Sequence, residues 1–180
     1  MPDAVSILSF LKRIFDLCMM RAGPQDMPAA RSWMVLSLTA YLLVSTLNAL
    51  PLSGFWAGLI QAVVETAVLV AWSYGALALT QHPQRLVQTL TALGSTGAVL
   101  GLVLMPQLLV LYHAEATGGQ APFTAVGYLI TLGWMIAVFG RIFRFALDLR
   151  QTWLGVATAL GFMFTASLLI TGFFGGAIGN

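Results

Sequence analysis

Glu65 lies well inside a long apolar run and is the residue in this sequence with the clearest capacity for chemistry. Insertion of a charged carboxylate at the centre of a bilayer costs about 2.5–3.5 kcal/mol, so a carboxyl at this depth calls for a specific role. Gln61 lies one helical turn away on the same face, and Asn48 and Gln107 occupy a similar depth in the neighbouring apolar runs. We therefore expect an intramembrane polar cluster of these four residues, with His113 near enough to approach it.

Two functions fit such a cluster. The first is a proton, ion or headgroup site open to the outer leaflet, as in a small transporter or channel component. The second is an interhelical lock, in which Glu65 is protonated or accepts a hydrogen bond from Asn48 or Gln107. No Lys or Arg lies at the depth of Glu65. The sequence therefore predicts a carboxyl that is neutral or paired with a group from outside the chain.

A second cluster of chemistry-bearing residues is basic and follows the fourth apolar run, in the stretch GRIFRFALDLRQ. Arg144 and Asp148 are four residues apart and can pair on a helix. Arg141 is close enough to Arg144 for a lipid phosphate or an acidic partner segment to sit between them. The alternative is ordinary snorkelling of arginines at the membrane edge. The predicted docking residues for lipid headgroups or a partner are Lys12, Arg13, Arg141, Arg144 and Arg150.

Small residues form the third signal. Gly94, Gly97 and Gly101 lie on one face of a helix at the spacing that lets two helices approach closely. The pairs Gly172–Gly176 and Gly175–Gly179 repeat the four-residue step. Such a face serves either close packing within the monomer or a homo-oligomer interface.

No catalytic set accompanies these clusters. The sequence has no HExxH, GxSxG or P-loop motif. Cys18 is the single cysteine, which excludes an internal disulfide, and the two histidines are predicted on opposite membrane faces. We expect no enzyme activity, no metal and no cofactor. With no basic stripe or aromatic-rich binding motif, we also expect no nucleic-acid partner.

The elements that must position these residues are membrane-spanning helices. The chain is 59% hydrophobic and 8% charged, with a mean hydropathy of +0.90. A span needs about 20 apolar residues, and five such runs fit. We therefore predict an all-α polytopic membrane protein. Residues 1–23 are expected to contain an amphipathic interfacial helix that starts at Asp3 and ends near Arg21. Residues 24–180 are expected to form the membrane domain. The predicted spans are 33–52, 58–79, 90–112, 125–145 and 153–175, with a turn at Pro51–Gly54, a kink at Pro106 and connections at Thr80–Gln88 and His113–Phe123.

The basic residues orient these spans. All eight precede the first span, follow the second, or lie at the inner end of the fourth and just after it, and none lies in the other connections. Under the positive-inside rule the N-terminus is cytoplasmic, and five spans place the C-terminus on the periplasmic side. Seven of the eight are Arg, which is typical of a GC-rich bacterial genome, so we expect the inner membrane of a bacterium.

Three stretches resemble the Yip1-type membrane proteins: GPQDMP before the first span, LVQTLTALGSTGAVL entering the third, and WMIAVFGRIFRFALDL leaving the fourth. The resemblance covers roughly residues 20–175. It implies a cytoplasmic N-terminal segment, five spans and a non-enzymatic role. We expect a scaffold, assembly factor or accessory subunit that binds membrane lipids and another membrane protein or its own copies. The alternative is the transporter or channel component built around Glu65.

Overall fold

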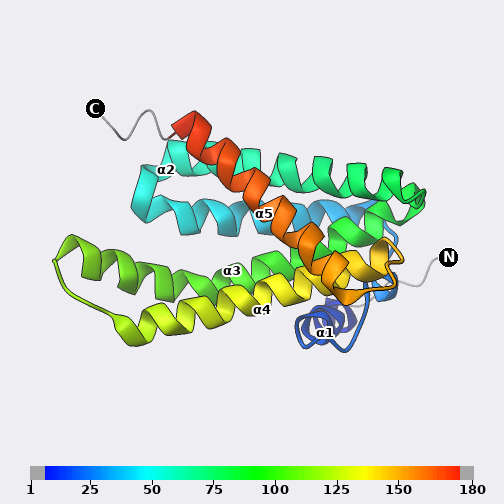
Figure 1. Cartoon of the computed structure of the whole chain (residues 1–180), viewed down its shortest axis with the longest axis horizontal. Helices are drawn as coiled ribbons and strands as arrows, with labels where there is room; N and C mark the ends of the chain where they lie inside the picture. The colour runs from blue at the N-terminus through cyan, green and yellow to red at the C-terminus, as the bar shows by residue number, and fades with distance from the viewer. Residues whose placement is uncertain (1–6, 175–180) are drawn as a thin grey trace.

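The computed structural model describes residues 7–174, and every regular element in that range is helical. The predicted cap Asp3 and the glycine pairs that reach beyond residue 174 lie outside this range. The elements are α1 (Ile7–Cys18), the 3-10 turn η1 (Pro24–Asp26), α2 (Arg31–Leu79), the 3-10 turn η2 (Pro83–Arg85), α3 (Leu86–Ala116), α4 (Pro122–Ala146) and α5 (Thr152–Phe174). The long helices lie side by side in a bundle (Figure 1).

The long element α2 contains 49 residues but reverses direction at Gly54. Gly54 has φ 74° and ψ 174°, a backbone conformation that is essentially restricted to glycine. We call residues 31–53 the first arm and residues 55–79 the second arm. The two arms return alongside each other (Figure 1), and Ser53 Oγ donates to Gln61 Oε1 across the bend at 3.4 Å. The predicted turn at Pro51–Gly54 was too long, because Pro51 remains inside the helix.

The other connections are also shorter than predicted. α3 continues through Pro106 to Ala116, and α4 begins at Pro122, so the connection between them is 117–121 rather than His113–Phe123. At the other end of α3, η2 and the first helical turn occupy part of the predicted Thr80–Gln88 connection. Helices extend past the apolar run because their polar end residues still form backbone hydrogen bonds, which hydropathy does not register.

α3 is the central helix of the bundle. Every residue from Thr89 to Ala98 is buried, and all four hydroxyl side chains of this stretch donate to carbonyl oxygens of their own helical segment. Thr91 donates to Val87 O at 2.7 Å and Ser95 to Thr91 O at 2.6 Å. Buried hydroxyls need hydrogen-bond acceptors. The carbonyl oxygen four residues earlier in the same helix provides one, so no other chain segment is required. Small hydroxyl residues therefore let α3 sit between its neighbours.

The glycine face of α3 packs against the first arm of α2. A Cβ added at Gly97 would lie 2.7 Å from the Tyr41 ring, and one at Gly101 would lie 2.7 Å from Val44. A Cβ added at Gly94 would lie 3.0 Å from the Ser37 backbone on the same arm. The three predicted glycines therefore serve packing within the monomer.

A second close crossing was not predicted and joins α4 to α5. A Cβ at Gly155 would overlap the carbonyl oxygen of Gly140, and one at Gly140 would lie 2.9 Å from Val156. The two glycines lie on different helices, fifteen residues apart in the sequence. A search for GxxxG spacing within one helix therefore does not detect them.

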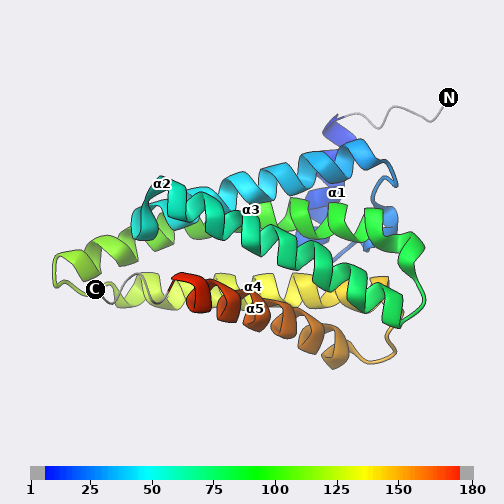
Figure 2. The same cartoon turned by 90° about the horizontal axis from the view of Figure 1, so that it is seen from above.

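α1 lies at one end of the bundle, beside α3 and α4 (Figures 1 and 2). Its inward face consists of Phe10, Ile14, Leu17 and Cys18, all buried. The Phe10 ring stacks on Trp33 with centroids 4.1 Å apart. The helix is shorter than predicted at its C-terminal end, where it stops at Cys18.

All eight Lys and Arg residues lie in segments at this same end, which we call the basic end; the opposite end, at the α2 bend, is the Gly54 end (Figure 1). Three side chains tie the basic end together. Trp134 Nε1 donates to Cys18 O at 2.8 Å, Gln88 Nε2 to Met27 O at 3.0 Å, and Arg85 Nη1 to Phe145 O at 3.1 Å. The N-terminal segment is thereby joined to α3 and α4.

Four of these helices are long and apolar enough to cross a membrane: α2, α3 with η2, α4 and α5. Large apolar side chains on their outer faces are exposed, among them Leu43 at 56% and Phe164 at 66%. An outer surface of this kind is typical of a helical protein embedded in a membrane.

Candidate functional site

A hollow inside the bundle, which we call the central cavity, has a volume of about 620 Å³ and is lined by both arms of α2 and by α3, α4 and α5. This volume falls within the range of about 300–1,000 Å³ typical of small-molecule sites. Asn48, Gln61 and Glu65 line it together with apolar side chains. The structure therefore brings three of the four predicted cluster residues to one space.

The partner of Glu65 is Tyr41, not Asn48 or Gln107 as predicted. The Tyr41 hydroxyl donates to Glu65 Oε1 at 2.5 Å, joining the first arm of α2 to the second. The carboxyl also interacts with the Ser45 side chain. Tyr41 and Ser45 precede Asn48 by seven and three residues, so helical spacing alone places them on the Asn48 face. That spacing was the signal that would have identified them.

The two amides of the wall have other roles. Asn48 Nδ2 donates to Gly101 O at 3.1 Å, which fixes the side chain against α3. Asn48 Oδ1 is buried and accepts no hydrogen bond. Gln61 accepts the Ser53 hydroxyl near the bend. Among the described residues that line the cavity, Glu65 is the only one with a formally charged side chain.

Gln107 and His113 do not join this group. Gln107 Nε2 donates to Thr131 Oγ1 at 3.1 Å and to Val103 O at 3.0 Å, so it faces α4. His113 is exposed near the end of α3. Their depth was compatible with a contact to Glu65, but the rotation of α3 about its own axis turns both away from the cavity.

The cavity is closed toward the basic end. Each wall helix carries a fully buried residue one turn beyond a wall residue in that direction: Leu69 beyond Glu65 on α2, Leu93 beyond Gly97 on α3, Phe143 beyond Phe139 on α4, and Ala159 beyond Phe162 on α5. In the other direction the wall continues to Leu52, Tyr128 and Thr171 near the Gly54 end. The geometry is that of a pocket with one carboxyl at its deeper part, not a continuous pore.

Tyr41→Phe should destabilise the protein by about 1–3 kcal/mol, because it removes the hydroxyl that donates to the part-buried Glu65 carboxyl. The measurement is the free energy of unfolding in mixed micelles with increasing dodecyl sulfate. Tyr74→Phe is the matched control, because this tyrosine is exposed on the second arm. Equal stabilities of the two variants would show that the Tyr41–Glu65 bond contributes nothing.

The predicted docking residues lie at the basic end but differ in their surroundings. The Arg141 and Arg144 guanidinium groups both approach the Phe145 ring, 4.9 and 5.5 Å from its centroid, and Arg141 Nε is buried without a hydrogen-bond partner. Arg13 Nη1 donates to Asp26 O at 2.5 Å and is thus held within the chain. Lys12 and Arg150 are exposed.

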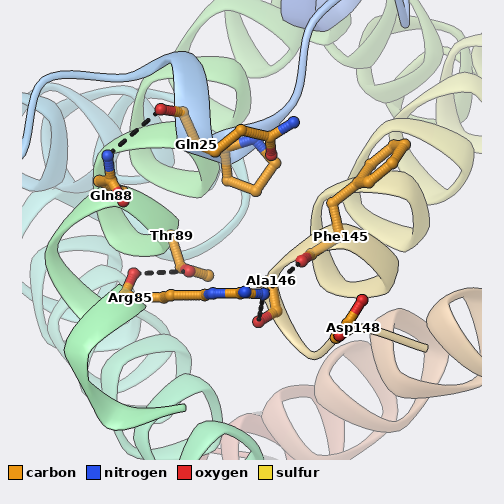
Figure 3. Close-up of a pocket in the computed structure, with 8 residues that line it drawn as sticks. Gln25, Arg85, Gln88, Thr89, Phe145, Ala146 and Asp148 are labelled. Atoms are coloured by element: carbon orange, nitrogen blue, oxygen red, sulfur yellow. Dashed lines mark hydrogen bonds between the residues drawn. The ribbon is translucent and has the colours of Figure 1, made fainter.

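The expected pairing of Arg144 with Asp148 is wrong. α4 ends at Ala146, and Asp148 has a left-handed backbone with φ 54°, so the two residues are not on one helical face. Asp148 instead lines a smaller end pocket of about 230 Å³, together with Gln25, Gln88 and Arg85 (Figure 3). Arg85 Nη1 donates to both Phe145 O and Ala146 O, carbonyls that the end of α4 leaves without helical donors.

Cys18 should react with thiol reagents far more slowly in the folded protein than in the unfolded one. It is buried on the inward face of α1, and burial raises the pKa of its thiol from 9.0 to about 11. The thiolate fraction at pH 8 is then about a hundredfold lower. Mass-detected alkylation with and without dodecyl sulfate tests this. Because the folded state disfavours the thiolate, stability falls only as the pH rises from about 9 to about 11. Rapid alkylation of the folded protein at pH 8 would contradict the buried position.

Among residues 7–174, no group of three or more His, Cys, Asp or Glu side chains is placed to hold a metal ion. Comparison with protein-family models, curated proteins and solved structures found no match to this chain.

Proposed function

We propose that this chain is a non-enzymatic, five-span membrane protein that binds a small amphipathic molecule in the central cavity. The observation that carries the proposal is a cavity of about 620 Å³ with mostly apolar walls and one carboxyl, Glu65, at its deeper part. A tightly packed interior would have favoured the interhelical lock alone. The Tyr41–Glu65 bond still links the two arms of α2, so the same carboxyl holds the wall together and faces the hollow.

The bend at Gly54 supports the count of five spans. It divides α2 into arms of 23 and 25 residues, each about 35 Å long at about 1.5 Å per residue, which is enough for a bilayer core of about 30 Å. The gathering of every Lys and Arg at the basic end supports a cytoplasmic basic end and N-terminus, with the C-terminus on the periplasmic side. A bacterial inner membrane is the location that fits this orientation.

Cysteine accessibility tests the topology. In a Cys18→Ser background, Gln84→Cys places a thiol on an exposed position in η2, and Gln120→Cys places one in the α3–α4 connection. An impermeant maleimide should label the thiol at position 120 in intact cells and the thiol at 84 only after the inner membrane is opened. Labelling of both from the same side would overturn the proposed orientation.

Photolabelling with an alkyl alcohol that carries a diazirine tests the binding function. We expect labelling of the peptides around Tyr41–Glu65 and Tyr128–Met135, and competition by excess unlabelled alcohol. Leu132→Trp, which fills part of the cavity from α4, should remove the saturable labelling and leave the lipid-facing labelling unchanged. Labelling that no competitor displaces would show that the cavity has no binding function.

A second candidate is the scaffold or accessory-subunit role, with the Yip1-like resemblance. One observation favours it: α1 has a second apolar stripe opposite the bundle, with Leu8, Leu11 and Phe15 exposed at 79%, 54% and 58%. This stripe suits either the membrane interface, with Lys12 beside lipid headgroups, or a partner protein. Purification from native membranes after crosslinking tests it. A partner that the wild type retains and Phe15→Gln loses would support this role, and recovery of the wild type alone would oppose it.

A further inference from the structure

We propose that the ligand of the central cavity carries an ammonium group on an apolar chain, with the ammonium at Glu65; this inference rests on the proposed binding function. Of the described residues that line the cavity, none is Lys, Arg or His, and Glu65 is the only one with a formal charge. A cavity of this kind repels headgroups with a net negative charge. Electrostatic complementarity therefore selects a cation.

Unused hydrogen-bond acceptors near Glu65 also favour a ligand group that donates hydrogen bonds. The Tyr41 hydroxyl donates to Oε1 of the carboxyl and the Ser45 side chain also interacts with the carboxyl, which leaves further lone pairs of the two carboxylate oxygens for a ligand. Asn48 Oδ1, in the same wall, accepts no hydrogen bond although it is buried. An ammonium group has three donors and no acceptor, so it matches a wall in which acceptors are in excess.

The remainder of the wall supplies surface for the methylene groups nearest the ammonium and for the apolar chain. Phe139 and Phe162 line the cavity at its deeper part, and aromatic faces attract alkylammonium groups. Leu52 and Ile170 line it toward the Gly54 end.

Glu65 lies eleven residues beyond Gly54, or about 16 Å along the second arm at about 1.5 Å per residue. A chain of roughly ten to twelve carbons fits that length.

The test uses photolabelling probes with the same diazirine-bearing decyl chain and three headgroups: primary ammonium, hydroxyl and carboxylate. The protein is held in nanodiscs of phosphatidylcholine, which keeps the surface charge constant. We expect the ammonium probe to reach half-saturation at a concentration about tenfold below that of the alcohol. The carboxylate should show no saturable labelling. The probes are compared by the concentration that gives half-saturation and not by the yield of labelled protein. The yield would be biased because diazirines react well with carboxyl groups such as that of Glu65.

Glu65→Gln keeps the shape of the side chain but removes the ion pair. The half-saturation concentration of the ammonium probe should then rise to within about twofold of that of the alcohol probe. Glu115→Gln is the matched control: it removes the same charge from an exposed position near the Gly54 end and should change nothing. If the ammonium and alcohol probes saturate equally, or if Glu65→Gln leaves the preference intact, the inference is wrong. If no probe labels saturably, the proposed binding function itself fails.

An ammonium amphiphile can come from the membrane or from solution. Replacing part of the phosphatidylcholine with phosphatidylethanolamine separates the two sources. A rise in the half-saturation concentration of the ammonium probe, absent in Glu65→Gln, would support the inference and assign the ligand to the lipid. An unchanged value would support a free lipophilic amine.

Discussion

Gly155→Ala should lower the free energy of unfolding by about 3 kcal/mol, the upper part of the usual range for overpacking. A Cβ at this position would overlap the Gly140 carbonyl oxygen and lie 2.9 Å from Arg144 Cβ. The overlapped atom belongs to the backbone of α4, so it cannot move aside as the end of a flexible side chain can. Relief requires the two helices to separate, which opens the packing of the basic end. Glycine at this crossing is therefore a requirement of the fold.

The measurement is unfolding in mixed micelles with increasing dodecyl sulfate, combined with the yield of monodisperse protein on size exclusion. Gly133→Ala is the control, because nothing lies within 4 Å of a Cβ added there. In a helix interior this change favours folding by up to about 1 kcal/mol. A Gly155→Ala variant as stable as Gly133→Ala would mean that α4 and α5 do not cross so closely.

Gly54→Ala should destabilise the protein by about 1–3 kcal/mol through backbone strain alone. Gly54 has φ 74° and ψ 174°, yet a Cβ there would meet nothing within 4 Å. Steric contact with the rest of the protein is thus excluded as a cause. The strain would act on the bend that brings Tyr41 to Glu65, so we also expect weaker saturable labelling of the cavity by the alcohol probe.

Gly75→Ala provides the control within the same element, since a Cβ there also meets nothing within 4 Å and no positive φ is present. It should be at least as stable as the wild type, because alanine is favoured over glycine in a helix interior, and its labelling should match that of the wild type. If Gly54→Ala behaves like Gly75→Ala, the reversal of α2 does not depend on the glycine backbone.

Much of the helical organisation was predictable because hydropathy and helical periodicity are properties of short segments. The all-helical architecture and the apolar long helices follow from such local patterns. The ends of helices were predicted less well. Ser53 and His113 are helical although each was placed in a connection, because a helix continues for as long as its backbone bonds are satisfied, whatever the polarity of the side chain.

The candidate site was predictable in part. Glu65 and Gln61 were identified because a carboxyl and an amide one turn apart are conspicuous in an apolar run. Tyr41 was missed because a tyrosine in such a run resembles any other packing residue. Gln107 was included wrongly because only its depth had been considered. Its side chain binds Thr131 instead, and no local pattern reports which neighbour a helix face meets.

The sequence by itself determined the position of each residue along the axis of the bundle. Apolar length sets where a helix crosses, and the placement of Lys and Arg sets which end is basic. Only the tertiary structure decided how each helix is rotated about its own axis. That rotation follows from close contacts such as Gly97 on Tyr41 and Gly155 on Gly140, between residues far apart in the chain. It is therefore the packing of small residues that turned Tyr41 and Glu65 toward one cavity and Gln107 away from it.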